Sequence, residues 1–151
     1  MKPKFQKLYN NIAHEVAKMS HARRLQVGAV IVKDDRVISM GYNGMPAGWD
    51  NNCESEETEF NLVTKTRTGT GKLTTRPEVL HAESNAIAKL AKSNDSGDGA
   101  DIFVTHAPCM ECSKLIFQSG IRRVYYSSDY RDDSGIKFLK QSGVEVIKHD
   151  E

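Results

Sequence analysis

The sequence predicts an α/β protein with a three-layer α/β/α arrangement, in which a five-stranded mixed sheet is covered by helices on both faces. Two observations lead to this prediction. Short apolar runs alternate with helical patterns after an initial strand pair, in the order αββαβαβα(β), and helices that separate strands usually cover both sides of the sheet. The 151 residues also contain no internal repeat and no linker-like segment, so we expect a single domain over residues 1–151.

The N-terminal part is expected to form one helix and a strand hairpin. Apolar side chains recur at the three- and four-residue spacings of an amphipathic helix of about four turns. These side chains are Phe5, Leu8, Ile12, Val16 and Met19. Residues 27–32 (Val-Gly-Ala-Val-Ile-Val) then read as a buried strand. Asp34 and Asp35 turn the chain, and residues 36–40 return as the second strand.

Residues 44 to about 77 are rich in Gly, Asn, Thr and Glu and show little periodicity. They are expected to form a long loop, and such loops in compact domains are usually functional or mobile. The remaining residues alternate between helix and strand patterns. Helices are expected at residues 81–92, 109–119 and 135–141, and strands at residues 102–104, 124–126 and 144–147.

Charge and cysteine content narrow the possible functions. Lys and Arg total 21 against 20 for Asp and Glu, which leaves a net charge of +1, and no window concentrates basic residues. A protein that grips long nucleic acid usually carries such a patch, so we expect a small-molecule partner. No apolar run is long enough for a membrane span, and no secretory leader is recognisable. Three cysteines suit a reducing compartment, and we expect a cytoplasmic protein.

Two short motifs together predict a catalytic zinc site. His81 begins the triplet His-Ala-Glu, and Cys109 and Cys112 lie in Pro-Cys-Met-Glu-Cys. These three side chains would hold a tetrahedral Zn²⁺ and leave the fourth position open, as catalytic zinc sites do. Glu83, two residues after the histidine, is placed to move protons rather than to bind metal. The combined H-x-E and P-C-x-x-C pattern is typical of zinc-dependent nucleobase deaminases.

Both halves of this pattern are expected at helix starts. The partial positive charge of a helix N-terminus stabilises a thiolate, which is the form of cysteine that binds metal. Pro108 helps to end the preceding strand and to set the helix entry. A Cys-x-x-Cys pair alone would also suit a redox or structural zinc site. A structural zinc is therefore the alternative for this cluster, although the adjacent carboxylate and the missing fourth ligand count against it.

From about residue 27 to residue 146 the chain resembles the deoxycytidylate (dCMP) deaminases of the cytidine-deaminase superfamily. The stretches that carry the resemblance are Val27–Val30, Gly41–Gly48, His81–Ile87 and Pro108–Cys112. The Gly-Tyr-Asn-Gly-Met-Pro-Ala-Gly stretch is the discriminating one, because the zinc motif is common to the superfamily. The resemblance implies a cytidine-deaminase-like fold and zinc-dependent deamination of dCMP to dUMP and ammonia, with Glu83 as the catalytic acid and base.

The same resemblance implies a substrate site. Arg24 would contact the 5′-phosphate, since a guanidinium binds phosphate bidentately; the alternative is a solvated loop arginine. Asn43 would hold the sugar and base edge, unless it is only a turn asparagine. The backbone N–H of Ala82 would bond the pyrimidine carbonyl oxygen. Tyr130 and Arg131 would cap the pocket, or else form an exposed turn pair.

Regulation is also implied, with dCTP activating and dTTP inhibiting a homo-oligomer that we expect to be a hexamer. The implied binding residues for the effector triphosphate and its Mg²⁺ are Gly41, Tyr42, Gly44, Met45, Ala47 and Gly48. Glycines let backbone amides approach phosphate oxygens closely. The alternative is a tight loop that only shapes the rim of the active site.

Two other functions stay open at this point. One is a deaminase of a base in tRNA or single-stranded DNA, which needs a path for flanking nucleotides and usually a basic channel. The other is a non-catalytic, zinc-stabilised interaction module, for which Glu83 would be dispensable. Cys53 is expected to be a free thiol, with a second zinc site as the alternative. His106 is expected either to line the pocket or to make a local hydrogen bond in its loop.

Overall fold

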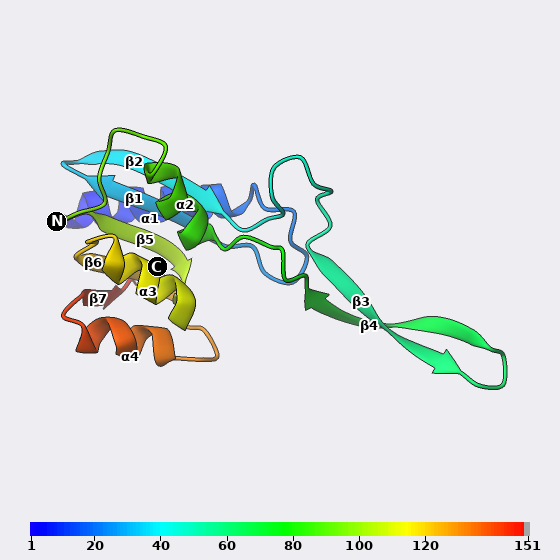
Figure 1. Cartoon of the computed structure of the whole chain (residues 1–151). Coiled ribbons are helices and arrows are strands. Elements are labelled where there is room, and N and C mark those ends of the chain that lie inside the picture. The colour runs from blue at the N-terminus through cyan, green and yellow to red at the C-terminus, as the bar shows by residue number, and fades with distance from the viewer. Residues whose placement is uncertain (150–151) are drawn as a thin grey trace.

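The computed structural model describes residues 1–149, whose core is a five-stranded sheet in the order β2-β1-β5-β6-β7 (Figure 1). The strands are β1 (Gly28–Lys33), β2 (Arg36–Tyr42), β5 (Asp101–His106), β6 (Arg123–Ser128) and β7 (Glu145–Lys148). β1 runs antiparallel to β2 and β5, whereas β5, β6 and β7 are parallel to one another. The predicted mixed sheet of five strands is confirmed.

The hairpin of β1 and β2 follows from its sequence. Asp34 and Asp35 have φ angles of 51° and 57°, the left-handed conformation that a two-residue hairpin turn requires and that aspartate tolerates. β1 lies between two other strands, and its residues from Gly28 to Val32 are all buried. β2 is an edge strand and is mostly exposed or half-buried. The continuous apolar run therefore marks the central strand of the pair.

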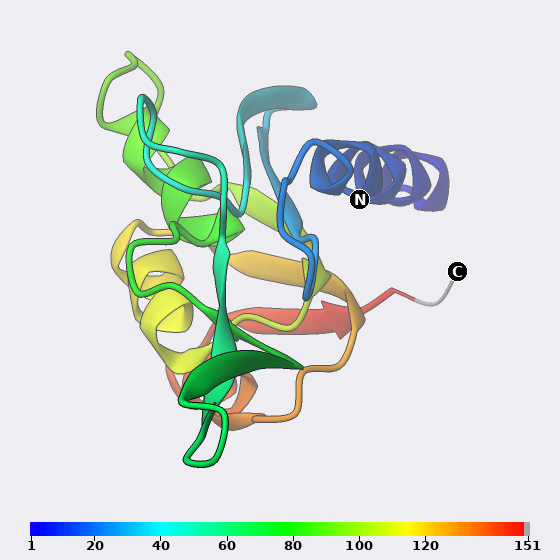
Figure 2. The ribbon, with the colours of Figure 1, turned by 90° about the vertical axis from the view of Figure 1, so that its right-hand side faces the viewer.

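Helices cover both faces of the sheet (Figure 2). α1 (Pro3–Ala17) packs on one face, while α2 (Ala82–Leu90), α3 (Met110–Gln118) and α4 (Ser134–Gln141) pack on the other. Successive side chains of a strand point to opposite faces, so the strands divide their apolar side chains between two core clusters. Val30, Val32, Phe103 and Tyr125 pack with α1, and Ala29, Ile31, Ile102, Val104 and Val124 pack with the other three helices.

Two glycines let helices rest directly on the β1–β2 pair. A Cβ atom at Gly28 would overlap the carbonyl oxygen of Ala13 in α1. At Gly41 it would lie 2.6 Å from the carbonyl oxygen of Ala82 and 2.7 Å from the amide nitrogen of Ala86, both in α2. Only glycine fits such close approaches. Gly41 therefore holds the N-terminus of α2 against the edge of the sheet where β2 ends.

The prediction of a loop over residues 44–77 is wrong for most of that segment. It contains an antiparallel ribbon of β3 (Glu54–Asn61) and β4 (Thr66–Thr75), which projects away from the body of the molecule (Figure 1). Apart from Glu54 and the half-buried Leu73, the side chains of both strands are exposed. A ribbon with no buried face shows no alternation of apolar and polar residues. Backbone pairing and the β-branched threonines of β4 hold it instead.

The base of this ribbon adjoins the body and its tip does not. At the base, Glu54 pairs with Thr75, and the Arg76 N–H donates to the Cys53 carbonyl oxygen. At the tip, the Asn61 side chain accepts hydrogen bonds from the next backbone amides and closes the turn. Phe60, Leu62 and Val63 at the tip are 50%, 82% and 91% exposed.

The predicted helices and strands outside this segment are all found, with bounds that differ by a few residues. Pro3, at the first turn of α1, starts that helix two residues earlier than the apolar pattern indicated, as suits proline at a helix start. Among residues 1–149, no helix combines the length and apolarity that a bilayer span requires.

Candidate metal centre and active-site pocket

The three predicted metal ligands meet at the N-termini of two helices. His81 is the N-cap residue of α2, Cys109 is the N-cap residue of α3, and Cys112 lies in the first turn of α3. His81 Nδ1 lies 3.3 Å from Cys112 Sγ and 3.6 Å from Cys109 Sγ. Within residues 1–149 this is the one group of three donors that lie close enough together to share a metal ion.

The donor distances fit a tetrahedral zinc ion. Zinc–nitrogen and zinc–sulfur bonds of about 2.1 and 2.3 Å, at the tetrahedral angle, would separate nitrogen from sulfur by about 3.6 Å. One imidazole and two thiols are also a donor set that zinc prefers over magnesium or calcium. Three protein ligands leave one position of the tetrahedron for water or substrate.

The surroundings of the two cysteines favour a thiolate. Hydrogen bonds from Cys112 and His81 lower the pKa of Cys109 to about 4. The same contact with Cys109, together with burial, raises the pKa of Cys112, so Cys109 loses its proton more readily than Cys112. Both thiols sit at the start of α3, where the helix dipole stabilises negative charge. Binding of a divalent cation would release the remaining proton.

We expect the purified protein to carry about one zinc ion per chain. Replacement of Cys109 by alanine should remove the metal and the catalytic activity together, because two donors hold zinc far less tightly than three. Elemental analysis beside an activity assay measures both. Cys53→Ala is the matched control for metal content, because Cys53 lines the same cavity but lies outside the three-donor group. Retained metal and activity in Cys109→Ala would contradict the assignment.

Glu83 lies in the first turn of α2, two residues from His81, and is only 4% exposed. Burial raises the pKa of its carboxyl group to about 7. A carboxyl group with such a pKa can both accept and donate a proton at neutral pH, as a general acid and base must. The structure therefore places a carboxyl group that can both accept and donate a proton beside the predicted metal ligands.

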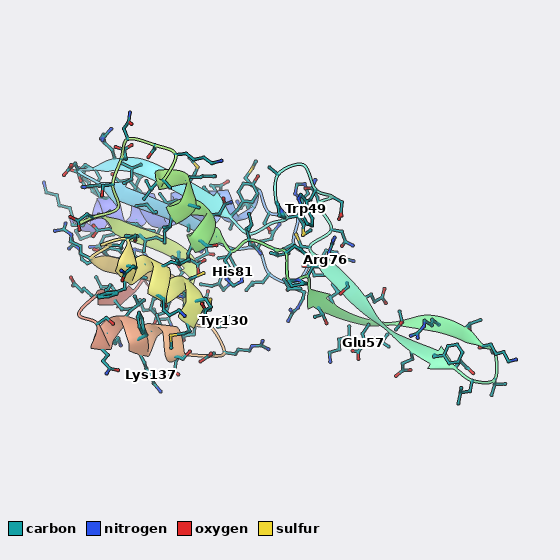
Figure 3. All side chains as sticks on the ribbon, viewed as in Figure 1. Trp49, Glu57, Arg76, His81, Tyr130 and Lys137 are labelled. Atoms are coloured by element: carbon teal, nitrogen blue, oxygen red, sulfur yellow. The ribbon has the colours of Figure 1, made fainter. Side chains whose placement is uncertain are left out.

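A cavity of about 540 Å³ opens beside these residues. His81, Glu83 and Cys109 line it, while Cys112 does not. All five residues predicted to bind substrate also line it, namely Arg24, Asn43, Ala82, Tyr130 and Arg131. Figure 3 shows that His81 and Tyr130 both lie at the end of the body nearest to the β3–β4 ribbon. Segments more than 100 residues apart in sequence thus meet in one pocket.

The two neighbouring arginines before β1 have different surroundings. Arg23 does not line the cavity; its guanidinium contacts Asn52 Oδ1 at 3.0 Å and Glu54 Oε2 at 3.4 Å. Arg24 lines the cavity and donates to Thr75 Oγ1 at 3.0 Å. Within residues 1–149, no carboxylate forms an ion pair with Arg24. Arg131 also lines the cavity, and its guanidinium lies 5.9 Å from the centre of the Tyr130 ring.

Asn43 holds the entrance to β1. Its Oδ1 accepts from the Val27 N–H at 2.8 Å, its Nδ2 donates to the Leu25 carbonyl at 2.8 Å, and its own carbonyl accepts from Ser20 Oγ at 2.7 Å. The side chain thus has a structural function that the sequence did not indicate. Its oxygen can accept one more hydrogen bond and its amide nitrogen can donate one more.

The six residues predicted to bind an effector do not line this cavity. Gly41 packs against α2, as described above, so helix packing explains this glycine without a phosphate. Gly44 pairs with Leu80 in an isolated bridge next to His81. Gly48 has a φ of 88° and open space where a Cβ would lie, which is the conformation that glycine adopts most readily.

Sequence reasoning missed several residues of the pocket. Glu54 and Thr75 come from the segment predicted to be a loop, and no local pattern distinguishes this glutamate from others in the segment. Cys53 is buried, which raises the pKa of its thiol, and it lies outside the three-donor group. His106 lines the cavity, and its Nδ1 also forms a hydrogen bond with Thr105 Oγ1 at 3.0 Å. The two predictions for His106, pocket lining and a local hydrogen bond, are therefore both confirmed.

A five-stranded α/β/α fold, with a His-Cys-Cys donor set at two helix starts and a buried glutamate beside it, defines a zinc-dependent deaminase. The family model for the cytidine and deoxycytidylate deaminase zinc-binding region matches residues 3–128. The chain belongs to this family.

Individual relatives agree with this assignment. ComE operon protein 2 of Bacillus subtilis is 41% identical over 135 residues, which are 89% of this chain and 65% of that protein. The chain therefore spans just under two thirds of that relative. Deoxycytidylate deaminase of Enterobacteria phage T4 is 33% identical over 90% of this chain and 85% of its own length. A dCMP deaminase of cyanophage S-TIM5, solved in complex with dCMP and dUMP, superposes with a TM-score of 0.84 at 41% identity and covers 99% of both chains.

Proposed function

We propose that residues 1–151 act as one deaminase domain that hydrolyses dCMP to dUMP and ammonia. One observation carries the proposal: a single cavity is lined by two of the three zinc donors, His81 and Cys109, and by Glu83, and also by Arg24 and Arg131. A nucleoside monophosphate needs this combination, because its base must reach the metal while its phosphate meets a cation. The phage T4 and cyanophage relatives carry the name of this activity.

His81, Cys109 and Cys112 would hold the zinc ion, and zinc in such a site supplies a water with its pKa lowered to about 7 as the nucleophile. Glu83 would accept a proton from that water as the oxygen attacks C4 of the pyrimidine. It would pass this proton to N3, then accept the proton of the hydroxyl group now on C4 and deliver it to the departing amino group. Water is consumed and ammonia is released, so Glu83 ends each turnover in its starting protonation state. The pKa near 7 suits both directions of transfer.

The remaining residues of the pocket would orient the nucleotide. Ala82 N–H, at the start of α2, points with the helix dipole and would bond the pyrimidine carbonyl oxygen. Asn43 would use its remaining donor and acceptor on the sugar. Tyr130 would close over the pocket, and Arg131 would add a second cation near the phosphate.

The test is ammonia release with cytidine, deoxycytidine, CMP, dCMP and dCTP as substrates. We expect dCMP to give the highest kcat/KM. Turnover of none of these compounds by zinc-loaded protein would contradict the proposal and would favour either a non-catalytic zinc module or a deaminase of a base in tRNA or single-stranded DNA. Tests on single-stranded oligonucleotides and tRNA would separate those two alternatives.

We further propose that the protein is a homohexamer in the cytoplasm, activated by dCTP and inhibited by dTTP, each bound with Mg²⁺. The supporting observation is that the segment 41–48 adjoins the active site at two points: Asn43 lines the cavity, and Gly44 pairs with Leu80, the residue before His81. An effector on this segment could therefore favour one arrangement of the active site over another, as allosteric coupling requires.

This regulation predicts a sigmoidal dependence of the initial rate on dCMP concentration. With dCTP and Mg²⁺ the curve should become more nearly hyperbolic, and with dTTP and Mg²⁺ the rate at a given dCMP concentration should fall. Initial rates over a range of dCMP concentrations measure the effect, and sedimentation gives the assembly size. Hyperbolic curves that neither triphosphate changes, or a monomer in solution, would rule out the regulation and leave the zinc chemistry intact.

A further inference from the structure

A buried glutamate lies in the wall of the cavity next to the proposed phosphate site. Glu54, the first residue of β3, is 1% exposed and lines the pocket together with Arg24 and Thr75. An anion at this position would repel a phosphate and would be costly to bury without partners. Its contacts therefore have to explain why it is there.

Those contacts lie on the segment that carries Arg24. Glu54 Oε1 accepts the backbone N–H of Arg23 at 2.8 Å and that of Arg24 at 3.0 Å. Glu54 Oε2 lies 3.4 Å from Nε of Arg23. Two amide hydrogen bonds to Oε1 and one ion pair at Oε2, which has no hydrogen-bond partner, thus hold the carboxylate. Hydrogen bonds to a charged acceptor are roughly twice as strong as neutral ones.

The segment between α1 and β1 has no regular backbone pairing of its own. Its N–H groups are satisfied from other places: Ala22 by Ser20 Oγ, Arg23 and Arg24 by Glu54, and Val27 by Asn43. Of these acceptors, Glu54 is the one that belongs to the β3–β4 ribbon. Without it, two adjacent amides would have to find new acceptors, and the backbone that aims Arg24 would shift.

The same contacts give the two arginine side chains different surroundings. Arg23 faces Glu54 and Asn52 and is not part of the cavity lining. Arg24 makes its side-chain hydrogen bond to the neutral hydroxyl of Thr75, which pairs with Glu54 across the ribbon. The guanidinium of Arg24 therefore keeps its positive charge available to an incoming anion.

We infer that Glu54 is a positioning residue for phosphate recognition: it fixes the backbone at residues 23–24, pairs with Arg23, and so leaves Arg24 for the 5′-phosphate of the substrate. The inference rests on the proposed deamination of a nucleoside monophosphate. It also gives the hairpin a function, because the base of the ribbon supplies both Glu54 and Thr75.

The test compares three replacements of Glu54 on dCMP and on deoxycytidine, which lacks the phosphate. Glu54→Ala removes both acceptor bonds and should raise KM for dCMP by about 10-fold or more with little change in kcat. Glu54→Asp keeps the charge, but its shorter side chain moves the carboxylate away from the N–H groups of residues 23 and 24, so it should also raise KM for dCMP. Glu54→Gln keeps an oxygen that can accept both N–H groups, and we expect KM within about 3-fold of the wild type. The kcat/KM for deoxycytidine should stay unchanged in all three.

Glu56→Ala is the matched control. Glu56 is two residues further along β3, accepts a backbone bond from Gly71 within the hairpin, and does not line the cavity. Its replacement disturbs the ribbon without touching residues 23 and 24, so KM for dCMP should stay at the wild-type value.

A double-mutant cycle with Arg24→Ala decides whether Glu54 acts through Arg24. In the Arg24→Ala background, Glu54→Ala should change KM for dCMP by less than about 2-fold, because the interaction that it positions is already gone. Additive effects, or equal losses on dCMP and deoxycytidine, would overturn the inference. Should Glu54→Ala fail to fold, a normal KM in a stable Glu54→Asp variant would overturn it as well. Failure of the wild type to deaminate dCMP would instead disprove the proposed function.

Discussion

Replacement of Glu83 by glutamine should nearly abolish turnover while zinc stays bound. Glutamine has the shape of glutamate but cannot accept and return a proton, and general acid–base help of this kind is worth about 100- to 10,000-fold in rate. The measurement is kcat for dCMP together with the zinc content of each variant.

Glu111→Gln is the matched control for this prediction. Glu111 is also a glutamate close to a metal ligand, since it directly precedes Cys112. Its side chain, however, is exposed and forms an ion pair with Lys114 at 3.1 Å. Its replacement should leave kcat and zinc content unchanged. Full activity in Glu83→Gln would exclude the proton-transfer role and would favour a non-catalytic zinc module.

Replacement of Arg24 by alanine should raise KM for dCMP by about 10- to 100-fold, the value of one or two hydrogen bonds to a charged group. The kcat at saturating dCMP should change much less, because the phosphate lies away from the reacting carbon. Activity on deoxycytidine should be unaffected, since that substrate has no phosphate to bind. Arg24→Lys should fall between the wild type and alanine, because lysine keeps the charge and loses the bidentate geometry.

Arg67→Ala provides the comparison for loss of one positive charge elsewhere. Arg67 lies on the exposed strand β4, outside the cavity lining, and bonds Thr58 within the ribbon. KM for dCMP should not respond to it. Equal damage by Arg24→Ala to dCMP and to deoxycytidine would mean that Arg24 supports the local fold and does not bind phosphate.

Most of the fold could be predicted because its signals are local. The buried run of β1, the aspartates at the β1–β2 turn and the three-and-four spacing in α1 each lie within a few neighbouring residues. The burial of β1 follows from the apolar run. In α1 the period predicted the helix but not its buried face, because Leu8 and Met19 of the apolar stripe are exposed while Tyr9 and Ala13 are buried. The β3–β4 ribbon was missed for the same reason, since strands exposed on both faces carry no such pattern.

The candidate metal centre was predictable for a related reason. His81 and Glu83 lie two residues apart, and Cys109 and Cys112 lie three apart, so each pair shares a helix start whatever the rest of the chain does. The chemistry of soft donors with an adjacent carboxylate then restricts the choice to very few kinds of site. Arg24, Asn43, Tyr130 and Arg131 came from resemblance alone, and the structure brings all four to the same cavity.

The sequence by itself determined the five-stranded sheet, its helices and the local pairs of metal-binding side chains, because these depend on patterns of neighbouring residues. Only the tertiary structure decided that Arg24 faces the cavity while Arg23 faces Glu54, and that Asn43 supports the entrance to β1. The glutamate at the base of the hairpin meets residues 23 and 24 some 30 positions away in the chain. Such contacts depend on how separate segments close on one another, and no short-range pattern of residue types encodes that closure.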